Sequence, residues 1–199
     1  MPEKNYRSAT GVDKFYYAPL NNLNVAEGTP ERVKFLQTVT VEMPQEPVRA
    51  YGDNRVAEIA VAAGDITVNA AFHKLPEEDK AVLLGLDKLE GVYAHGSSDA
   101  PPYVAVVFAR TYQDGSTEWV GLTKGMFLRP NKSAQTKQGS VEFGPDEISA
   151  AFMDREVEGF DDEKSVLFAK DAKGETTNRD ALFNMIFGSA YPTDIPEGA

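Results

Sequence analysis

The side chains best suited to catalysis gather in one short segment, which contains His95, Ser97, Ser98 and Asp99. Serine, histidine and aspartate are the nucleophile, the base and the orienting acid of a hydrolase triad. Such triads are assembled in space from distant parts of a chain, so adjacency in sequence is no evidence for one. Residues 94–102 are rich in Gly, Ser, Asp and Pro, and this composition predicts a polar loop before a strand.

Two further groups could hold a metal ion or act as a base. Asp161, Asp162 and Glu163 could bind calcium, but they lack the alternating spacing of an EF-hand loop, and the acidic balance of the chain favours a solvated loop. His73 ends a predicted strand, where a lone histidine is usually a surface or hydrogen-bonded residue. With two His and no Cys, the chain offers little to a transition metal.

Sequence motifs for phosphate or acyl chemistry are missing. The chain contains no Gly-x-x-x-x-Gly-Lys-Ser/Thr loop, no Gly-x-Gly-x-x-Gly and no Gly-x-Ser-x-Gly elbow. Asn131-Lys132-Ser133 fits a glycosylation triplet, but the polar N-terminus shows no secretory signal. We therefore predict no enzyme activity, no catalytic residues, no cofactor-binding residues, no cofactors and no metal ligands.

Composition narrows the range of partners. The net charge is -11, from 31 acidic and 20 basic residues, which argues against wrapping nucleic acid and against docking on anionic lipid. The same charge would let DNA slide past without sticking. No segment has the roughly 20 apolar residues of a membrane-spanning helix, and the lack of Cys excludes disulfides.

Alternation with a period of two dominates the chain and predicts strands. Residues 33–43 place Val33, Phe35, Gln37, Val39, Val41 and Met43 on a dry face, and Lys34, Leu36, Thr38, Thr40 and Glu42 on a wet one. Pro44 and Pro47 then interrupt the pattern. Strands 56–62 and 66–72 form a hairpin or short meander around turns at Gly52-Asp53-Asn54 and Gly64-Asp65.

The strongest hairpin signal is Asp114-Gly115, between strands 103–112 and 117–128, because both central residues of a type I′ turn need positive φ. Another strand pair is expected within 141–153, and an edge strand at 165–169. The aromatic residues of these and the N-terminal strand are expected in the core rather than on a ligand platform: Phe15, Tyr16, Tyr17, Tyr103, Phe108, Tyr112, Trp119 and Phe127.

Two helices are expected. The first spans 76–86, with Pro76 in its first turn and Leu75, Val82, Leu83 and Leu86 on one apolar face. The second spans about 178–187, is capped by Thr177 or Asn178, and stops at Gly188; its apolar stripe is Leu182, Phe183, Ile186 and Phe187.

These elements predict a mainly β (α+β) fold, a β-sandwich or small barrel with a flanking α-helix. We expect a single domain at 11–188, an N-terminal arm at 1–10 and a C-terminal arm at 189–199. The arms are expected to be disordered or to become ordered only on a partner.

In sequence, the chain resembles the major tail proteins, or tail tube proteins, of long-tailed non-contractile phages and prophages of Gram-positive bacteria. The likeness covers most of residues 10–188 and depends on the order of its pieces. These are residues 10–20, Tyr51-Gly52-Asp53-Asn54, residues 75–86, 100–108 and 119–127, the polar run 130–139, and the closing helix with Phe183 and Phe187.

The resemblance implies a structural subunit of the virion tail, without catalytic residues, assembled in the bacterial host cytoplasm. Such subunits self-assemble into stacked rings, usually hexameric, around the channel for genome ejection. The implied partners are the subunit itself, a tape-measure protein, a tail terminator and baseplate proteins. Genome DNA would pass without specific binding, and no membrane would be involved. The wet face of 34–42, with Thr38, Thr40 and Glu42, could then line the channel.

Two other interpretations of the protein's function remain open. One is the inner tube of a contractile tail, tailocin or secretion system, which would have nearly the same fold. The other is a monomeric β-sandwich binding module, which would need an exposed aromatic platform or a groove.

Overall fold

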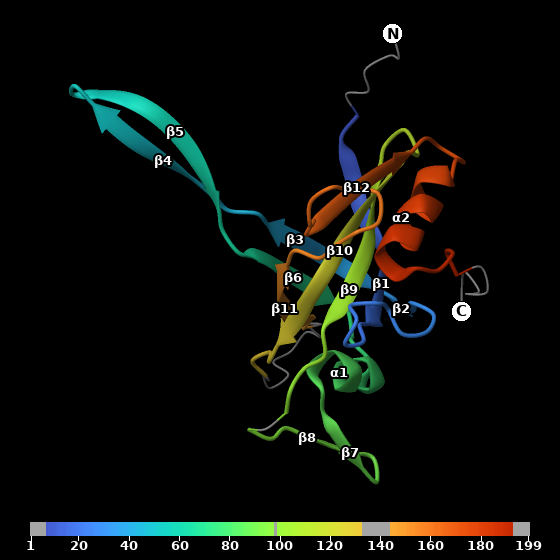
Figure 1. The fold of residues 1–199 in the computed structure, drawn as a ribbon. Coiled ribbons are helices and arrows are strands. Elements are labelled where there is room, and N and C mark those ends of the chain that lie inside the picture. The colour runs from blue at the N-terminus through green and yellow to red at the C-terminus, as the bar shows by residue number, and fades with distance from the viewer. Residues whose placement is uncertain (1–6, 98, 133–143, 193–199) are drawn as a thin grey trace, which may run out of the picture.

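A computed structural model describes residues 7–97, 99–132 and 144–192 of the chain. The fold is mainly β, with one large antiparallel sheet and two helices, as expected for a sandwich with a flanking helix. The sheet order is β2-β1-β9-β10-β11-β6-β3, and β12 also pairs with β10 (Figure 1). Its strands are β1 (Ala9–Pro19), β2 (Glu31–Val33), β3 (Leu36–Glu42), β6 (Ile66–Phe72), β9 (Val104–Tyr112), β10 (Thr117–Leu128), β11 (Asp146–Met153) and β12 (Val166–Asp171).

Strand β10 makes the sheet fold back on itself. Its first half pairs with β9 on one edge and β12 on the other, whereas residues 124–128 pair with β11. The register shifts between Leu122 and Gly125, where the strand changes partners. As a result β6, β11 and β3 lie across the core from β1 and β9, and the Phe15 and Phe72 rings meet edge-on at 5.1 Å.

Strand β9 is buried on both faces, which explains its continuous apolar run. One face carries Val104, Val106 and Phe108 into the core between the folded halves of the sheet. The other face, with Ala105 and Val107, is covered by helix α2 (Thr177–Phe187) through Leu182, Phe183, Ile186 and Phe187 (Figure 1). Strands buried on both sides lose the polar half of the alternation.

The predicted 103–112 and 117–128 hairpin is confirmed, but its turn type is not. Only Gly115 has positive φ in this turn, and its amide donates to Tyr112 O. The two consecutive positive φ angles that a type I′ turn needs occur instead at Asp53 and Asn54, with φ of 50° and 60°. The expected strand pair in 141–153 is a single strand, β11, and residues 141–143 lie outside the described part. The edge strand expected at 165–169 is confirmed as β12.

The alternation predicted over 33–43 fails at Phe35. This residue has a φ of 63°, so the chain turns between β2 and β3 and the predicted single strand becomes two. Phe35 and Met43, expected on the dry face, are 67% and 49% exposed, and Gln37 is exposed too. Leu36, expected on the wet face, packs on the core because the register shifts between Leu36 and Thr38. Val39 and Val41 pack inward as expected.

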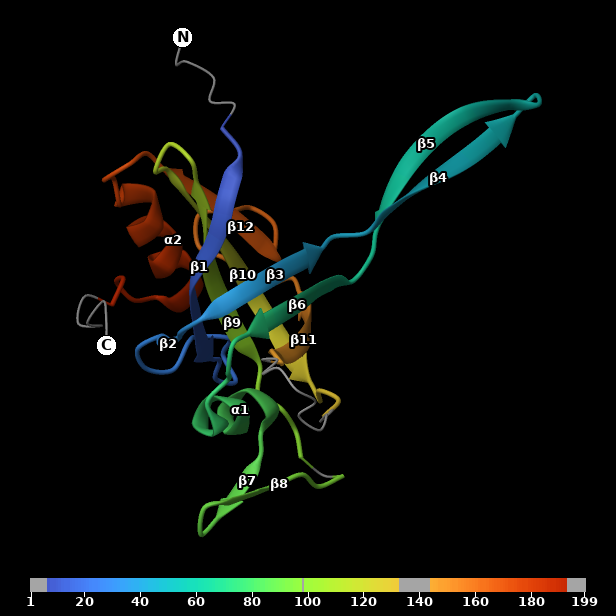
Figure 2. The same cartoon turned by 180° about the vertical axis from the view of Figure 1, so that it is seen from behind.

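The other predicted meander is also rearranged. Strand β5 (Arg55–Ala63) pairs with β4 (Gln45–Gly52), not with β6, and the pair extends away from the body between β3 and β6 (Figure 2). Pro47, expected to interrupt the strand, lies inside β4 opposite Val61. A strand with no neighbour on its second edge tolerates a residue that donates no hydrogen bond. A smaller hairpin, β7 (Asp87–Leu89) and β8 (Val92–Ala94), extends from helix α1 (Glu77–Leu84) at the other end (Figure 1).

Helix α1 (Glu77–Leu84) is shorter than the predicted 76–86 and buries Leu83 and Leu84. Val82, expected on the buried face, is exposed, because the helix faces the sheet through the 83–84 pair. Tyr17 Oη donates to Asp79 Oδ1 at 2.7 Å and ties the helix to β1. Burial first, and then this carboxylate, raise the pKa of Tyr17.

Helix α2 is capped by buried charges from outside the helix, not by Thr177 or Asn178 as predicted. The Asp171 carboxylate, 1% exposed, accepts the amides of Asn178 and Arg179 at 2.9 Å. At the other end Arg155 donates to the carbonyls of Met185 and Ile186. Each charge complements the helix dipole and satisfies backbone groups that the helix leaves open. Gly188 ends the helix, as predicted, with a φ of 65°.

Replacing Asp171 with alanine should therefore destabilise the subunit by about 2 kcal/mol, the upper range for loss of a cap. Asp171→Asn should cost less, because its amide oxygen still accepts one hydrogen bond. Urea unfolding measures both changes. Equal stability of the alanine variant and the native chain would contradict this role.

Candidate functional site

The β4–β5 hairpin is the most exposed feature of the structure. Every residue of both strands is exposed. Cross-strand partners share a face of a two-stranded ribbon, and the pairs Pro47/Val61, Arg49/Ile59 and Tyr51/Val56 therefore form one face. We call these six residues the apolar face of the hairpin; Arg49 is its only charged side chain.

The opposite face of the hairpin is different in character. It carries Glu46, Val48, Ala50, Glu58, Ala60 and Ala62, in the pairs Glu46/Ala62, Val48/Ala60 and Ala50/Glu58. An isolated two-stranded hairpin is at best marginally stable in water. Its large side chains, such as Tyr51 at 70% and Ile59 at 60% exposure, form an exposed apolar surface of the kind that marks interaction sites.

A second surface is the outer face of β3, β6 and β11. The strand registers align three cross-strand rungs, which we call the polar ladder: Thr38, Ala71 and Glu147; Thr40, Asn69 and Ser149; Glu42, Thr67 and Ala151. None of the nine side chains is buried, and none is basic. The predicted wet side of strand 34–42 is thus placed correctly from Thr38 to Glu42.

A hollow of about 400 Å³ lies over this ladder. It is lined by Thr38, Thr40, Asn69, Glu147 and Ser149, and also by Arg129. The hydroxyl and amide groups hydrogen-bond water, and the Glu147 carboxylate repels phosphate. Beside the ladder, β3 is the last strand of the sheet, and no described strand pairs with its outer edge.

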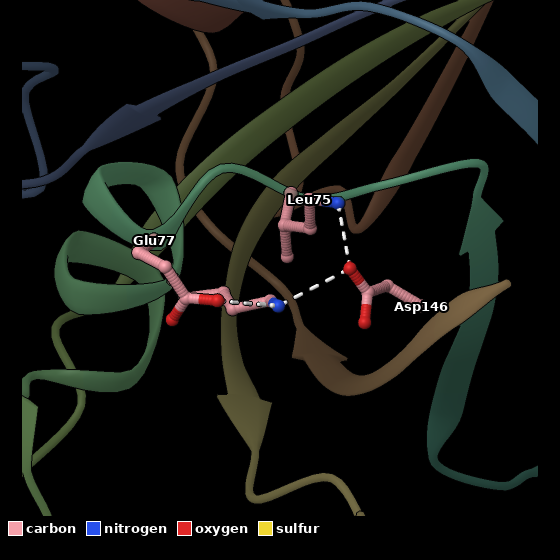
Figure 3. A network of polar contacts seen from close by, with 4 residues as sticks. Leu75, Glu77 and Asp146 are labelled. Carbon is pink, nitrogen blue, oxygen red and sulfur yellow. Dashed lines mark hydrogen bonds and ion pairs between the residues drawn. The ribbon is translucent and has the colours of Figure 1, made fainter. Parts of the chain in front are cut away.

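A polar network fixes the end of β11 to α1 (Figure 3). Asp146 accepts hydrogen bonds from the Leu75 amide at 2.9 Å and from Lys80 Nζ at 3.1 Å, and Lys80 also contacts Glu77 at 3.1 Å. Burial alone would raise the pKa of Asp146, but the Leu75 amide and the Lys80 ammonium outweigh it, and the pKa is lowered. For Lys80, burial would lower the pKa, but the hydrogen bonds that its ammonium donates to both carboxylates raise it.

Both shifts stabilise the charged forms of these groups. The network therefore consists of ionic contacts that position α1.

The same network predicts a dependence of stability on pH. A carboxyl group with a lowered folded-state pKa stabilises the fold above its unfolded value, about 3.9, and this contribution is lost as the pH falls through the folded value. Native stability should therefore fall more steeply below about pH 4 than that of Asp146→Asn. Because the pair is partly exposed, we expect the native advantage at neutral pH to be at most about 1 kcal/mol. The measurement is the free energy of unfolding of both proteins as a function of pH. If it fell equally steeply for both below pH 4, this assignment would be contradicted.

The residues singled out for chemistry in the sequence do not form a reacting site in the described part of the chain. His95 Nδ1 lies 3.8 Å from Asp99 Oδ2, and this carboxylate accepts the Gly96 amide at 2.6 Å, which closes a polar loop. Ser97 is exposed, with no hydrogen bond to His95 among the described contacts, and Ser98 lies outside the described residues. His73 donates its backbone amide to Phe35 O.

The remaining candidates also lie in loops or in the core. Asp161, Asp162 and Glu163 are exposed, with Asp162 4.0 Å from Lys164. Asn131 and Lys132 are exposed, and Ser133 lies outside the described part, as does most of the polar run 130–139. Within residues 7–97, 99–132 and 144–192, no cluster of three His, Asp or Glu could hold a metal. No helix there is long and apolar enough to cross a bilayer.

The core assignment of the aromatic residues is confirmed for six of the eight. Phe15, Tyr16, Tyr17, Phe108, Trp119 and Phe127 are buried, whereas Tyr103 is 39% exposed and Tyr112 is partly exposed. Tyr103 and Tyr112 instead lie under Lys124 and Lys170. Nothing in the sequence signals the apolar face of the hairpin, because the alternation there has the same form as in an ordinary half-buried strand.

Comparison with known proteins adds one finding to this geometry. The profile of a family described as phage tail tube protein matches residues 36–192, which is well over half of the chain. A search of curated proteins gave no match.

Proposed function

The chain belongs to the phage tail tube protein family, and from this membership we propose that it assembles with copies of itself into stacked, hexameric rings that form the channel for DNA ejection. Family membership gives the coarser statement directly: the protein is a structural component of the phage tail tube. It also points to a non-enzymatic protein.

The observation that carries the proposal is the fully exposed β4–β5 hairpin with its apolar face. A copy of the same chain would cover this face and convert a marginal ribbon into a packed layer. The free edge of β3 supports lateral assembly, because an unpaired edge can accept a strand from a neighbour. Contacts between unlike surfaces are head-to-tail and generate rings or filaments, depending on whether the rotation closes.

The polar ladder supports the proposal that the assembled subunits enclose a channel. It lies beside the free edge of β3, so strand addition there would extend the same face from one subunit to the next. Its uncharged or acidic side chains would not hold the DNA backbone. We propose that Thr38, Thr40 and Glu42 face the lumen.

We also propose domain boundaries, partner proteins and a place of assembly, as the resemblance to tail tube proteins implies. Residues 11–188 would act as one domain, with arms at 1–10 and 189–199 that reach neighbouring subunits. Ala9 and Thr10 belong to β1, and the centroid of the Tyr191 ring lies 5.0 Å from that of Phe183. The end of each arm next to the domain is therefore held by the fold. Residues 1–6 and 193–199 lie outside the described part. The tape-measure, terminator and baseplate proteins would be the partners, and assembly would take place in the host cytoplasm.

Sedimentation velocity of the purified chain over a wide concentration range tests self-assembly. We expect a monomer that gives way to large species as the concentration rises. A chain that stays monomeric throughout, with tail-assembly partners supplied, would favour a binding module instead.

The lumen assignment can be tested by labelling, since the native chain has no cysteine. Thr40→Cys should react with a bulky maleimide in the free subunit and be protected in rods. Asp162→Cys, in the exposed loop after β11, should react in both states. Equal reactivity of the two variants in rods would place the polar ladder on the outer wall.

A further inference from the structure

Phe35 combines backbone strain with exposure. Its φ of 63° is one that a bulky side chain rarely adopts, whereas Gly or Asn would adopt it at lower cost. A buried ring could offset the strain by packing, but the Phe35 side chain is 67% exposed. Strain retained at an exposed aromatic side chain points to a contact outside the subunit.

The position of Phe35 is fixed by its neighbours. Its carbonyl accepts the His73 amide at 2.9 Å, and the two rings lie 6.5 Å apart. This holds Phe35 at the end of β6 that leads to α1. Strand β3 runs from there to the β4–β5 hairpin, a length of roughly 20 Å. Phe35 and the hairpin therefore lie at opposite ends of one strand.

We propose that Phe35 is the contact through which one copy of the chain holds the apolar face of the β4–β5 hairpin of another copy. This inference rests on the proposed self-assembly and specifies the surfaces that meet. Because the two surfaces lie at opposite ends of β3, binding between them joins copies head to tail, and the same contact can repeat along a chain of copies.

The chemistry of the two ends is complementary. Helix α1 begins four residues after His73 and leads into the small β7–β8 hairpin, which exposes Leu89 and Val92. The first turn of α1 carries the exposed acid Glu78, which suits Arg49, the one charge on the apolar face of the hairpin. An aromatic anchor inside a polar rim is typical of a protein–protein interface.

Phe35→Asn tests the proposal, because asparagine keeps the backbone conformation and removes the ring. Its midpoint of urea unfolding should not fall below that of the native chain. The concentration needed for polymerisation should rise about tenfold or more, as for other hot-spot residues. Phe35→Tyr should behave as native, and so should Phe160→Asn, which removes another exposed phenylalanine. Native polymerisation of Phe35→Asn would overturn the proposal.

Crosslinking identifies the surface that Phe35 meets. A photoreactive benzoylphenylalanine replaces Phe35, and the polymer is irradiated and digested for mass spectrometry. We expect crosslinks to residues 45–63 of another copy. Crosslinks confined to other segments in intact polymer would overturn the Phe35–hairpin contact and leave the proposed function standing. A native chain that never polymerises would overturn both.

Discussion

Replacing Ile59 with glutamate should abolish polymerisation and leave the subunit folded. Ile59 is 60% exposed and lies at the centre of the apolar face of the hairpin, opposite Arg49. An exposed side chain contributes little to the stability of the free subunit. In an assembly, a glutamate there would have to be desolvated, which costs several kcal/mol per ion, and a cross-strand pair with Arg49 would offset only part of that cost. Light scattering measures polymerisation, and circular dichroism checks the fold.

The matched control is Ala60→Glu, which adds the same charge one residue away on the opposite face. It should polymerise nearly as the native chain does. If both variants failed equally, added charge and not the apolar face would be responsible. If Ile59→Glu polymerised normally, this face would not be an interface.

Gly125→Ala should have the largest effect on folding. Gly125 lies opposite Phe152 in the β10–β11 ladder, next to the register shift in the pairing with β9, where β10 exchanges β12 for β11 on its other edge. A Cβ at this position would lie 2.6 Å from Cγ and Cε1 of the Phe152 ring, far inside van der Waals contact. Because Phe152 packs in the core, it cannot move away freely. We expect a loss of about 3 kcal/mol, at the upper end for overpacking.

Gly11→Ala provides the comparison, because its Cβ would meet only Thr111 Oγ1, at 3.4 Å. Its unfolding midpoint in urea should change little. Gly121→Ala should fall between the two, since its Cβ would lie 2.8 Å from Ile186 Cγ1, a less severe overlap. Native stability of Gly125→Ala would mean that the bend of β10 does not depend on this close packing.

Much of the fold could be predicted because its signals are local. The continuous apolar run of β9, the Asp114-Gly115 turn and the Gly188 stop each act within a few residues. The cap of α2 could not be predicted in this way, because Asp171 reaches its amides from the preceding strand. The break at Phe35 had no sequence signal, since a phenylalanine in an alternating run normally continues a strand.

The functional surfaces were only partly predictable, for a related reason. Alternation correctly placed Thr38, Thr40 and Glu42 on a wet face. It could not show that the residues of β4 and β5 are exposed on both faces, because the pattern of a half-buried strand is the same whether the cover is the subunit's own core or another subunit. Which surface covers an alternating strand is decided by tertiary and quaternary structure.

Electron microscopy of the purified full chain at high concentration tests the account most directly. We predict hollow rods built of stacked rings, with an open channel along the axis. Uniform single particles at every concentration, also with tail-assembly partners present, would contradict it.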